Sequence, residues 1–135
     1  KTNNGLVMVN FYSDYINCFP NNISEPANGT LSQVADHIDY IKEKIGIDHV
    51  GIGGDYDGVD TLPIGLEDVS TYPALFAELV KRRYTEEDLM KLAGKNLIRV
   101  FMDVEKVRDD LRSQEPLETL INQTTWENLP CRTDF

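Results

Sequence analysis

The sequence predicts an α/β fold in which two buried parallel strands are joined by an amphipathic helix. Two apolar runs of strand length, residues 6–11 and 49–54, are typical of strands covered on both faces. Between them, residues 31–45 carry apolar side chains at helical spacing. A strand, a helix and a second strand in this order form a βαβ unit with parallel strands and a right-handed crossover.

The helix between the two strands has clear start and stop signals. Thr30 is the expected N-cap, and Gln33 follows three residues later, as in a capping box. Gly46 supplies the stop. The side chains expected to face inward are Leu31, Val34, Ala35, Ile38, Ile41 and Ile45.

Two further helices are expected in the second half, after an irregular loop at residues 59–70. Pro73 fits the first turn of one helix, and Thr85 opens the next, with acidic residues well placed in its first turn. Gly94 predicts a bend or break in this last helix. The side chains expected to face inward are Leu75, Phe76, Leu79, Val80, Leu89, Leu92, Ala93, Leu97, Val100, Phe101 and Val104.

Residues 12–29 are expected to form a loop, and helical periodicity disappears from residue 112 onward. We therefore divide the chain into an α/β unit, residues 1–112, and an extended tail, residues 113–135. Two strands do not make a stable sheet by themselves, which points to the last part of a larger α/β domain. The isolated fragment is expected to be inert and poorly folded, because its strands would expose their edges.

Composition excludes some partners and indicates a compartment. The 23 acidic and 13 basic residues give a net charge of −10, which disfavours nucleic acid and anionic membrane surfaces. Three glycosylation sequons, at Asn22, Asn28 and Asn122, favour a secreted or cell-surface protein. Cys18 and Cys131 fit that compartment if they are oxidised, although two unpaired buried thiols remain the alternative.

The second strand ends in two glycines and an acidic turn, residues 53–58. An Asp at the carboxyl end of a parallel strand is typical of a catalytic group, and this position makes Asp55 the candidate. Asp57 is expected to be structural, accepting backbone donors in the turn. A calcium loop of the EF-hand type is excluded, because its glycine is the sixth residue and here it is the fourth. We do not expect His37 or His49 to bind metal.

Beyond these local patterns, the chain resembles the membrane (renal) dipeptidases along nearly its whole length. The segments that carry the resemblance are residues 6–12, 31–39, 50–58, 65–70, 96–101 and 131–133. The resemblance implies a zinc metallodipeptidase with a (β/α)8 TIM-type barrel, of which this chain is the C-terminal portion, the last two strands plus the C-terminal helices. It also implies two Zn²⁺ ions that activate a bridging water, with ligands on earlier strands outside this chain.

The same resemblance assigns roles to individual positions. Asp55 matches an Asp that contacts the amino end of a dipeptide substrate and transfers a proton to the leaving amine. Tyr15 matches a substrate-binding tyrosine near the substrate carboxylate. Cys18 matches a cysteine bonded to an upstream partner, and Cys131 one that links two subunits into a homodimer. A lipid (GPI) anchor is expected just beyond Phe135, at the cell surface.

The resemblance leaves one alternative function open. The chain could belong to a non-catalytic, glycosylated surface protein that serves in adhesion or binding, and the upstream metal ligands would decide between the two. Asn96 and Arg99 recur in the family pattern on a helix far from the strand ends. Buried hydrogen bonding is the expected role of both.

Overall fold

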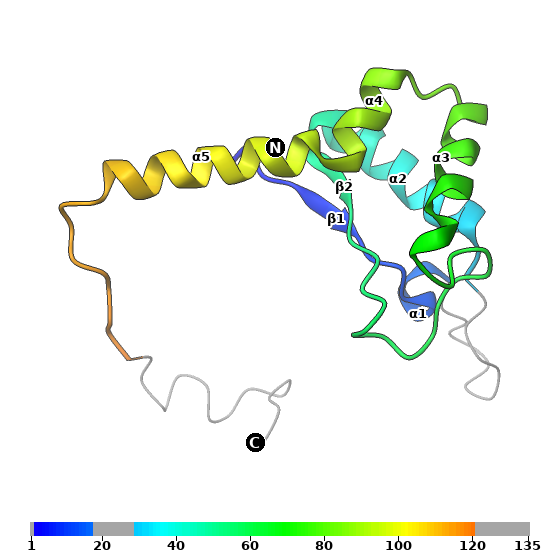
Figure 1. Cartoon of the computed structure of the whole chain (residues 1–135), viewed down its shortest axis with the longest axis horizontal. Helices are drawn as coiled ribbons and strands as arrows, with labels where there is room; N and C mark the ends of the chain where they lie inside the picture. Colours follow the sequence, from blue (N-terminus) through cyan, green and yellow to red (C-terminus); the bar gives the residue numbers. More distant parts are fainter. Residues whose placement is uncertain (1, 18–28, 121–135) are drawn as a thin grey trace.

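The computed structural model describes residues 2–17 and 29–120, and it contains the predicted parallel strand pair (Figure 1). Strand β1, Val7–Val9, pairs in parallel with β2, Val50–Ile52, with Val9 opposite Ile52. Both strands are shorter than the apolar runs that predicted them. The second run begins late because its first residue, His49, ends a 3₁₀ helix, Ile47–His49.

The connection between the strands is helix α2, Leu31–Ile45, with the predicted caps at both ends. The Thr30 hydroxyl accepts from the Gln33 amide N–H, and the Gln33 side chain accepts from the Thr30 N–H. Gly46 follows with φ of +96°, a left-handed conformation that favours glycine. Val34, Ala35 and Ile38 are buried, as predicted for the inward face.

The core lies between the strands and the helices that cover one side of them (Figure 1). Helix α3, Tyr72–Lys81, packs beside α2 and buries Leu75 and Leu79. The prediction that Val80 faces inward is wrong, because its side chain is 56% exposed. The predicted loop at residues 12–29 also contains a short helix that periodicity did not reveal, α1, Ser13–Ile16.

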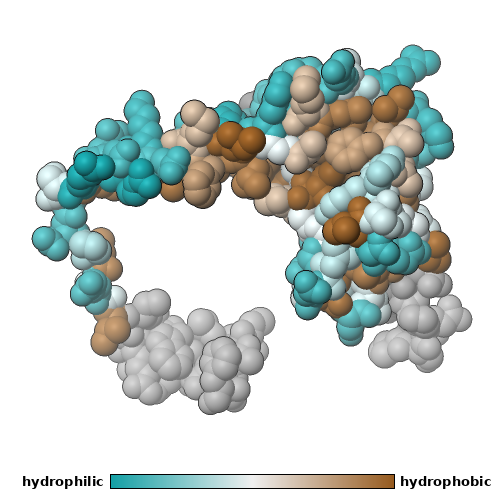
Figure 2. Space-filling model, viewed as in Figure 1, coloured by the Kyte–Doolittle hydropathy of each residue, from teal (hydrophilic) through white to brown (hydrophobic). Residues whose placement is uncertain are grey.

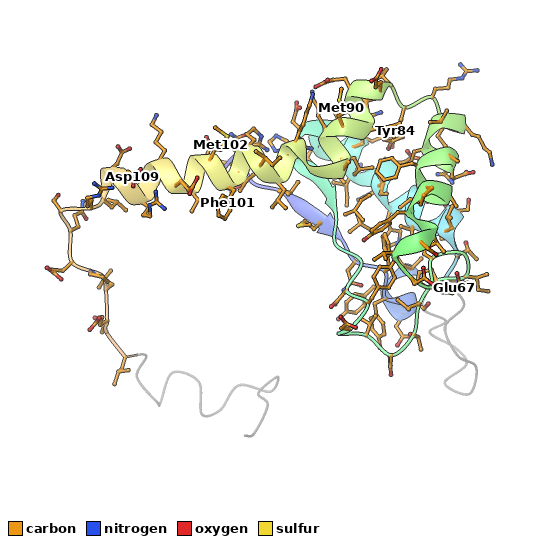
Figure 3. All side chains as sticks on the ribbon, viewed as in Figure 1. Glu67, Tyr84, Met90, Phe101, Met102 and Asp109 are labelled. Atoms are coloured by element: carbon orange, nitrogen blue, oxygen red, sulfur yellow. The ribbon has the colours of Figure 1, made fainter. Side chains whose placement is uncertain are left out.

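Polar contacts join α2 to the segment that follows α3. Tyr84, labelled in Figure 3, donates a hydrogen bond to Asp39 at 2.7 Å. Burial and this hydrogen bond raise the pKa of Tyr84 well above its usual value. The Lys42 ammonium lies 3.7 Å from the centre of the Tyr84 ring and pairs with Asp88 at 3.0 Å. Asp88 belongs to α4, Glu86–Met90, whose N-cap Thr85 forms the second capping box.

The chain changes direction at Gly94, as predicted. Residues 91–95 form a π-helical segment in which Gly94 leaves helical geometry, and α5, Asn96–Asp110, begins directly after it. Asn96 is buried and its Nδ2 donates to the carbonyl oxygens of Ile47 and Val50, at 2.6 and 2.9 Å. The prediction of buried hydrogen bonding for Asn96 is therefore confirmed.

Arg99, on the first turn of α5, fixes the helix to the amino ends of the two strands. Its guanidinium donates to the carbonyl oxygens of Asn4 and Asp48, at 2.8 and 2.7 Å. Both carbonyls lie just before a strand. Helix α5 is thereby fixed to the amino ends of β1 and β2, opposite to the edge where Asp55 lies.

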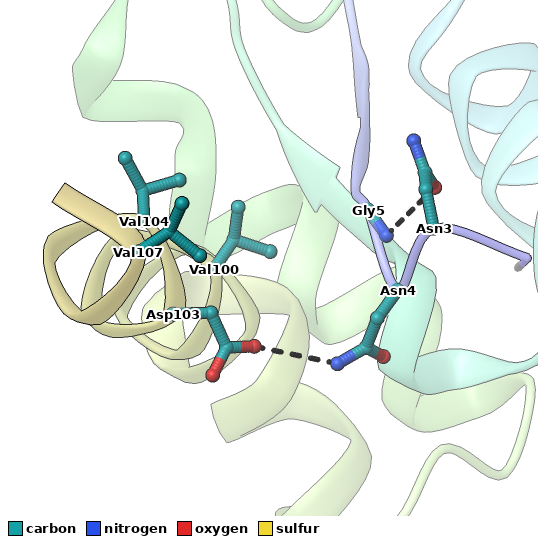
Figure 4. Close-up of a pocket in the computed structure, with 7 residues that line it drawn as sticks. All are labelled: Asn3, Asn4, Gly5, Val100, Asp103, Val104 and Val107. Atoms are coloured by element: carbon teal, nitrogen blue, oxygen red, sulfur yellow. Dashed lines mark hydrogen bonds between the residues drawn. The ribbon is translucent and has the colours of Figure 1, made fainter. Parts of the chain in front are cut away.

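Beyond this attachment, α5 extends away from the core and leaves its apolar face open (Figures 1 and 2). The inward orientation expected for Leu97, Phe101 and Val104 is wrong within the described chain, since each is 46–63% exposed. A groove of about 250 Å³ lies where Val100, Val104 and Val107 of α5 approach residues 3–5 (Figure 4).

After α5 the described chain, to residue 120, has no further helix or strand. Among the helices of the described residues, none has the length and apolar character needed to cross a membrane.

Candidate active site

Asp55 lies three residues beyond β2, at the carboxyl end of the strand pair, and its side chain is exposed. Its backbone has φ of +61°, in the left-handed region that Asp and Asn enter more readily than most residues. The Gly58 amide N–H donates to the Asp55 carbonyl oxygen at 3.0 Å. This hydrogen bond closes the turn.

Asn10 lies at the end of β1 and meets Asp55 across the two strand ends. Its Nδ2 donates to Oδ2 of Asp55 at 2.8 Å, and its Oδ1 accepts from the Tyr12 amide N–H at 2.6 Å. Sequence reasoning missed Asn10. The available signal was its position, a polar residue near the carboxyl end of the first apolar run.

A polar pocket of about 360 Å³ opens beside this pair and brings Tyr15 and Asp55 to one place. Tyr15 is the outermost of its aromatic residues, 71% exposed, and its ring meets the ring of Tyr12 edge-on at 4.8 Å. The residues that line the pocket are Asn10, Tyr12, Tyr15, Asp55, Gly58, Val59 and Asp60.

Tyr12 is held in the pocket wall by a hydrogen bond from its hydroxyl to Asp14 at 2.6 Å. That hydrogen bond raises the pKa of Tyr12 to about 12, because ionisation would place a second negative charge beside the carboxylate. The Tyr12 hydroxyl therefore stays protonated at neutral pH.

Three aromatic rings pack together beside Gly54, the residue before Asp55. Phe11 is fully buried and meets the rings of Tyr56 and Tyr72 edge-on, at 6.0 and 5.8 Å between centroids. Gly54 lies so close to these rings that a Cβ there would come within 2.9 Å of the Tyr72 hydroxyl and closer still to Tyr56. The missing side chain of Gly54 therefore leaves room for aromatic side chains of the chain itself.

Asp57 lies outside the pocket and is exposed. The prediction that it accepts backbone donors is wrong, since its carboxylate accepts no hydrogen bond from the described part of the chain. The turn is closed through the Asp55 carbonyl instead.

Neither histidine is near the pocket. His37 lies on α2, and Nδ1 of His49 is 2.9 Å from the Gly5 carbonyl oxygen. Within residues 2–17 and 29–120, no three His, Cys, Asp or Glu side chains gather as a metal site would require. The expected disulfide and glycosylation positions, Cys18, Cys131, Asn22, Asn28 and Asn122, lie outside the described residues.

Known proteins match this chain over a region that includes both strands, the pocket and the helices. The profile of "Membrane dipeptidase (Peptidase family M19)" matches residues 1–115. Dipeptidase 3 of Homo sapiens is 48% identical over 118 residues, 87% of this chain and 23% of the human protein. Dipeptidase aclJ of Aspergillus oryzae is 44% identical over 118 residues, 87% of this chain and 27% of the fungal protein.

Solved structures agree with the sequence matches. Dipeptidase AC, a metallopeptidase of family M19, superposes with a TM-score of 0.60 at 33% identity, over 70% of this chain and 26% of that one. A metallopeptidase from Rhodobacter sphaeroides, bound to a phosphinate mimic of the dipeptide L-Ala-D-Ala, gives 0.59 at 33% identity, over 69% and 25%. The chain spans about a quarter of the curated relatives it matches. Together these matches place the chain in the membrane dipeptidase family, peptidase family M19.

Proposed function

We propose that this chain is the C-terminal quarter of a zinc-dependent dipeptidase and supplies the proton-transfer group of its active site, Asp55. The observation that carries the proposal is the position of Asp55, at a strand end and in one pocket with Tyr15. Relatives named dipeptidases support peptide hydrolysis. The carboxylate of Asp55, which lines a polar pocket and is held by Asn10, favours the enzyme over the alternative, a non-catalytic surface protein.

Asp55 is suited to carry a proton between water and the leaving amine. Its Oδ2 is held by Asn10, while Oδ1 accepts no hydrogen bond from the described residues, and the residue lines the pocket. In the proposed reaction Asp55 takes a proton from the water that attacks the peptide carbonyl. It then delivers that proton to the amine nitrogen as the C–N bond breaks.

Tyr15 is proposed to bind the carboxyl end of the dipeptide. Its hydroxyl can donate a hydrogen bond to the carboxylate of the substrate, and its ring is fixed edge-on by Tyr12. The pocket, about 360 Å³, is at the lower end of the size range for small-molecule sites.

The described residues do not fit a metal site, since no three of their His, Cys, Asp or Glu side chains gather in a ligand arrangement. We propose that the two zinc ions of the intact enzyme are held by ligands outside this chain. In such enzymes the metal supplies an activated water.

The surrounding fold is proposed to be a (β/α)8 barrel, with residues 1–112 as its final part and 113–135 as an extended tail. Each strand of the pair has a free edge within the described chain, and the open face of α5 is continuous with the exposed amino end of β1. Earlier strands of the same barrel would cover both.

A substitution in the intact enzyme tests the catalytic proposal. Asp55→Asn should lower kcat about 10²- to 10⁴-fold, the usual contribution of general acid–base catalysis. Asp57→Asn is the matched control and should keep wild-type activity, because Asp57 lies two residues away and outside the pocket. Full activity of Asp55→Asn on a dipeptide would overturn the proposal.

Chelation should abolish turnover of the intact enzyme. Dipeptide hydrolysis that survives complete zinc removal would overturn zinc dependence.

The cell-surface features also remain proposals. We propose an extracellular glycoprotein modified at Asn22, Asn28 and Asn122, lipid-anchored beyond Phe135 and dimerised through Cys131, with Cys18 in an intrachain disulfide. Non-reducing electrophoresis of the intact protein should show a dimer that Cys131→Ser converts to a monomer. A monomer in the wild type would contradict the disulfide link.

A further inference from the structure

We infer that Asn10 is a positioning residue for Asp55, fixing the orientation in which the carboxylate exchanges its proton. This inference rests on the proposed function of Asp55. The contact joins the ends of two strands, 45 residues apart in sequence, at 2.8 Å. It is the one side-chain hydrogen bond that the Asp55 carboxylate accepts within the described residues.

The orientation of the Asn10 amide is determined by its two partners. The Tyr12 backbone N–H can only donate, so the atom 2.6 Å from it must be the carbonyl oxygen Oδ1. That places the amino group toward Asp55, where an ionised carboxylate can only accept. Both neighbours require the same orientation, so the amide cannot rotate by 180° without breaking both hydrogen bonds.

The backbone around both residues leaves little freedom. Val9, just before Asn10, is paired opposite Ile52, and its carbonyl oxygen accepts from the Gly53 N–H at 3.0 Å. The register of the strands therefore fixes the backbone positions from which the Asn10 and Asp55 side chains extend. On the other side of the carboxylate, Oδ1 of Asp55 lies over Gly58, in space that a Cβ would fill.

Asp55 needs this hydrogen bond because neither burial nor an ion pair restrains its carboxylate within the described residues. The side chain is exposed, and no cation among the described residues pairs with it. An unsupported Asp side chain would sample several rotamers, and a displacement of about 1 Å in a reacting group can cost about 10²-fold in rate. One donated hydrogen bond from a side chain that is itself fixed restricts this motion.

Asn10→Asp in the intact enzyme is the sharpest test. It keeps the size of the side chain and the oxygen that accepts from Tyr12, but it replaces the donor to Asp55 with a carboxylate that repels it, whereas Asn10→Ala removes the donor without adding charge. We expect kcat on a dipeptide to fall about 10- to 100-fold with KM within about threefold. Asn10→Ala should cause a similar fall in kcat, and Asp57→Asn should cause none. Wild-type kcat in Asn10→Asp would overturn the inference.

A double-mutant cycle separates positioning from a general structural effect. If Asn10 acts through Asp55, then adding Asn10→Ala to Asp55→Asn should change the residual kcat less than twofold. A full 10- to 100-fold further loss in that background would show an effect independent of Asp55 and would overturn the inference. An inactive wild-type enzyme would contradict the proposed function instead, so the two failures are distinguishable.

Discussion

Gly58 lies directly beneath the carboxylate of Asp55, and Oδ1 of Asp55 occupies the space that a Cβ on Gly58 would need. Gly58 does not adopt the left-handed conformation, so its backbone would accept alanine. What excludes a side chain at this position is the Asp55 carboxylate itself.

Gly58→Ala should therefore displace Asp55 and reduce the kcat/KM of the intact enzyme about 10²-fold, with little loss of stability. Gly94→Ala is the matched control, because no heavy atom of another described residue lies within 4 Å of a Cβ added there. Dipeptide hydrolysis and the thermal unfolding midpoint of both variants decide the outcome. Equal activity of the two variants would show that the carboxylate relaxes without consequence.

Asn96→Ala should destabilise the protein without altering the site. The Asn96 amide donates to two carbonyl oxygens, of Ile47 and Val50, and its removal leaves buried acceptors without partners, at about 2–3 kcal/mol. Denaturant unfolding of the intact enzyme measures this loss, and kcat of the folded protein should not change. Lys95→Ala, at the exposed neighbouring position, provides the control. A loss in kcat for Asn96→Ala would contradict a purely structural role.

The ion pair of Asp88 with Lys42 should make stability depend on acid pH. Burial is the largest single influence and opposes ionisation of Asp88, but the hydrogen bonds from Lys42 and Thr85 and the charge of Lys42 together outweigh it and lower the pKa of Asp88 below its usual value. Since the folded-state pKa is depressed, the contribution is complete above about pH 4 and is lost as the pH falls further. Because the pair is partly exposed, it contributes about 1 kcal/mol or less.

Thermal unfolding of wild type and Asp88→Asn as a function of pH measures this contribution. Wild type should unfold at higher temperature at pH 7, and the two curves should converge as the pH falls below about 4. A constant difference down to pH 2 would show that the carboxylate charge is not the cause.

The isolated chain should not form a cooperative, active unit. Leu97, Phe101 and Val104 remain exposed on α5, and β1 and β2 have no further neighbours in the described residues. We expect purified residues 1–135 to bind a hydrophobic dye and to hydrolyse no dipeptide. A sharp thermal transition of the isolated chain would contradict this expectation.

Local features of the fold could be predicted from the sequence because their causes are local. The capping box at Thr30, the helix start at Thr85 and the break at Gly94 each depend on residues a few positions apart. Asp55 was found because the end of a parallel strand is a known place for reactive groups. That role, like the substrate-binding role of Tyr15, stays a prediction.

The rest depends on contacts between distant residues. Asn10 was overlooked because its partner, Asp55, is 45 positions away. Helix α1 was missed because four residues are too few for a periodic pattern. The apolar stripe of α5 was recognised, but the sequence could not show that none of the described residues would cover it.

The paired register of β1 and β2 has a consequence for how such an enzyme can change its preferences. Main-chain hydrogen bonds between the strands fix the backbone positions of Asn10 and Asp55. Tyr12 and Tyr15 belong to the segment that follows Asn10. The strands therefore hold the backbone of Asn10 and Asp55, while the residue proposed to bind substrate, Tyr15, lies on the short helix α1. Under the roles proposed above, substitutions in α1 would alter substrate preference, while the strand pairing that spaces Asn10 and Asp55 is inherited unchanged.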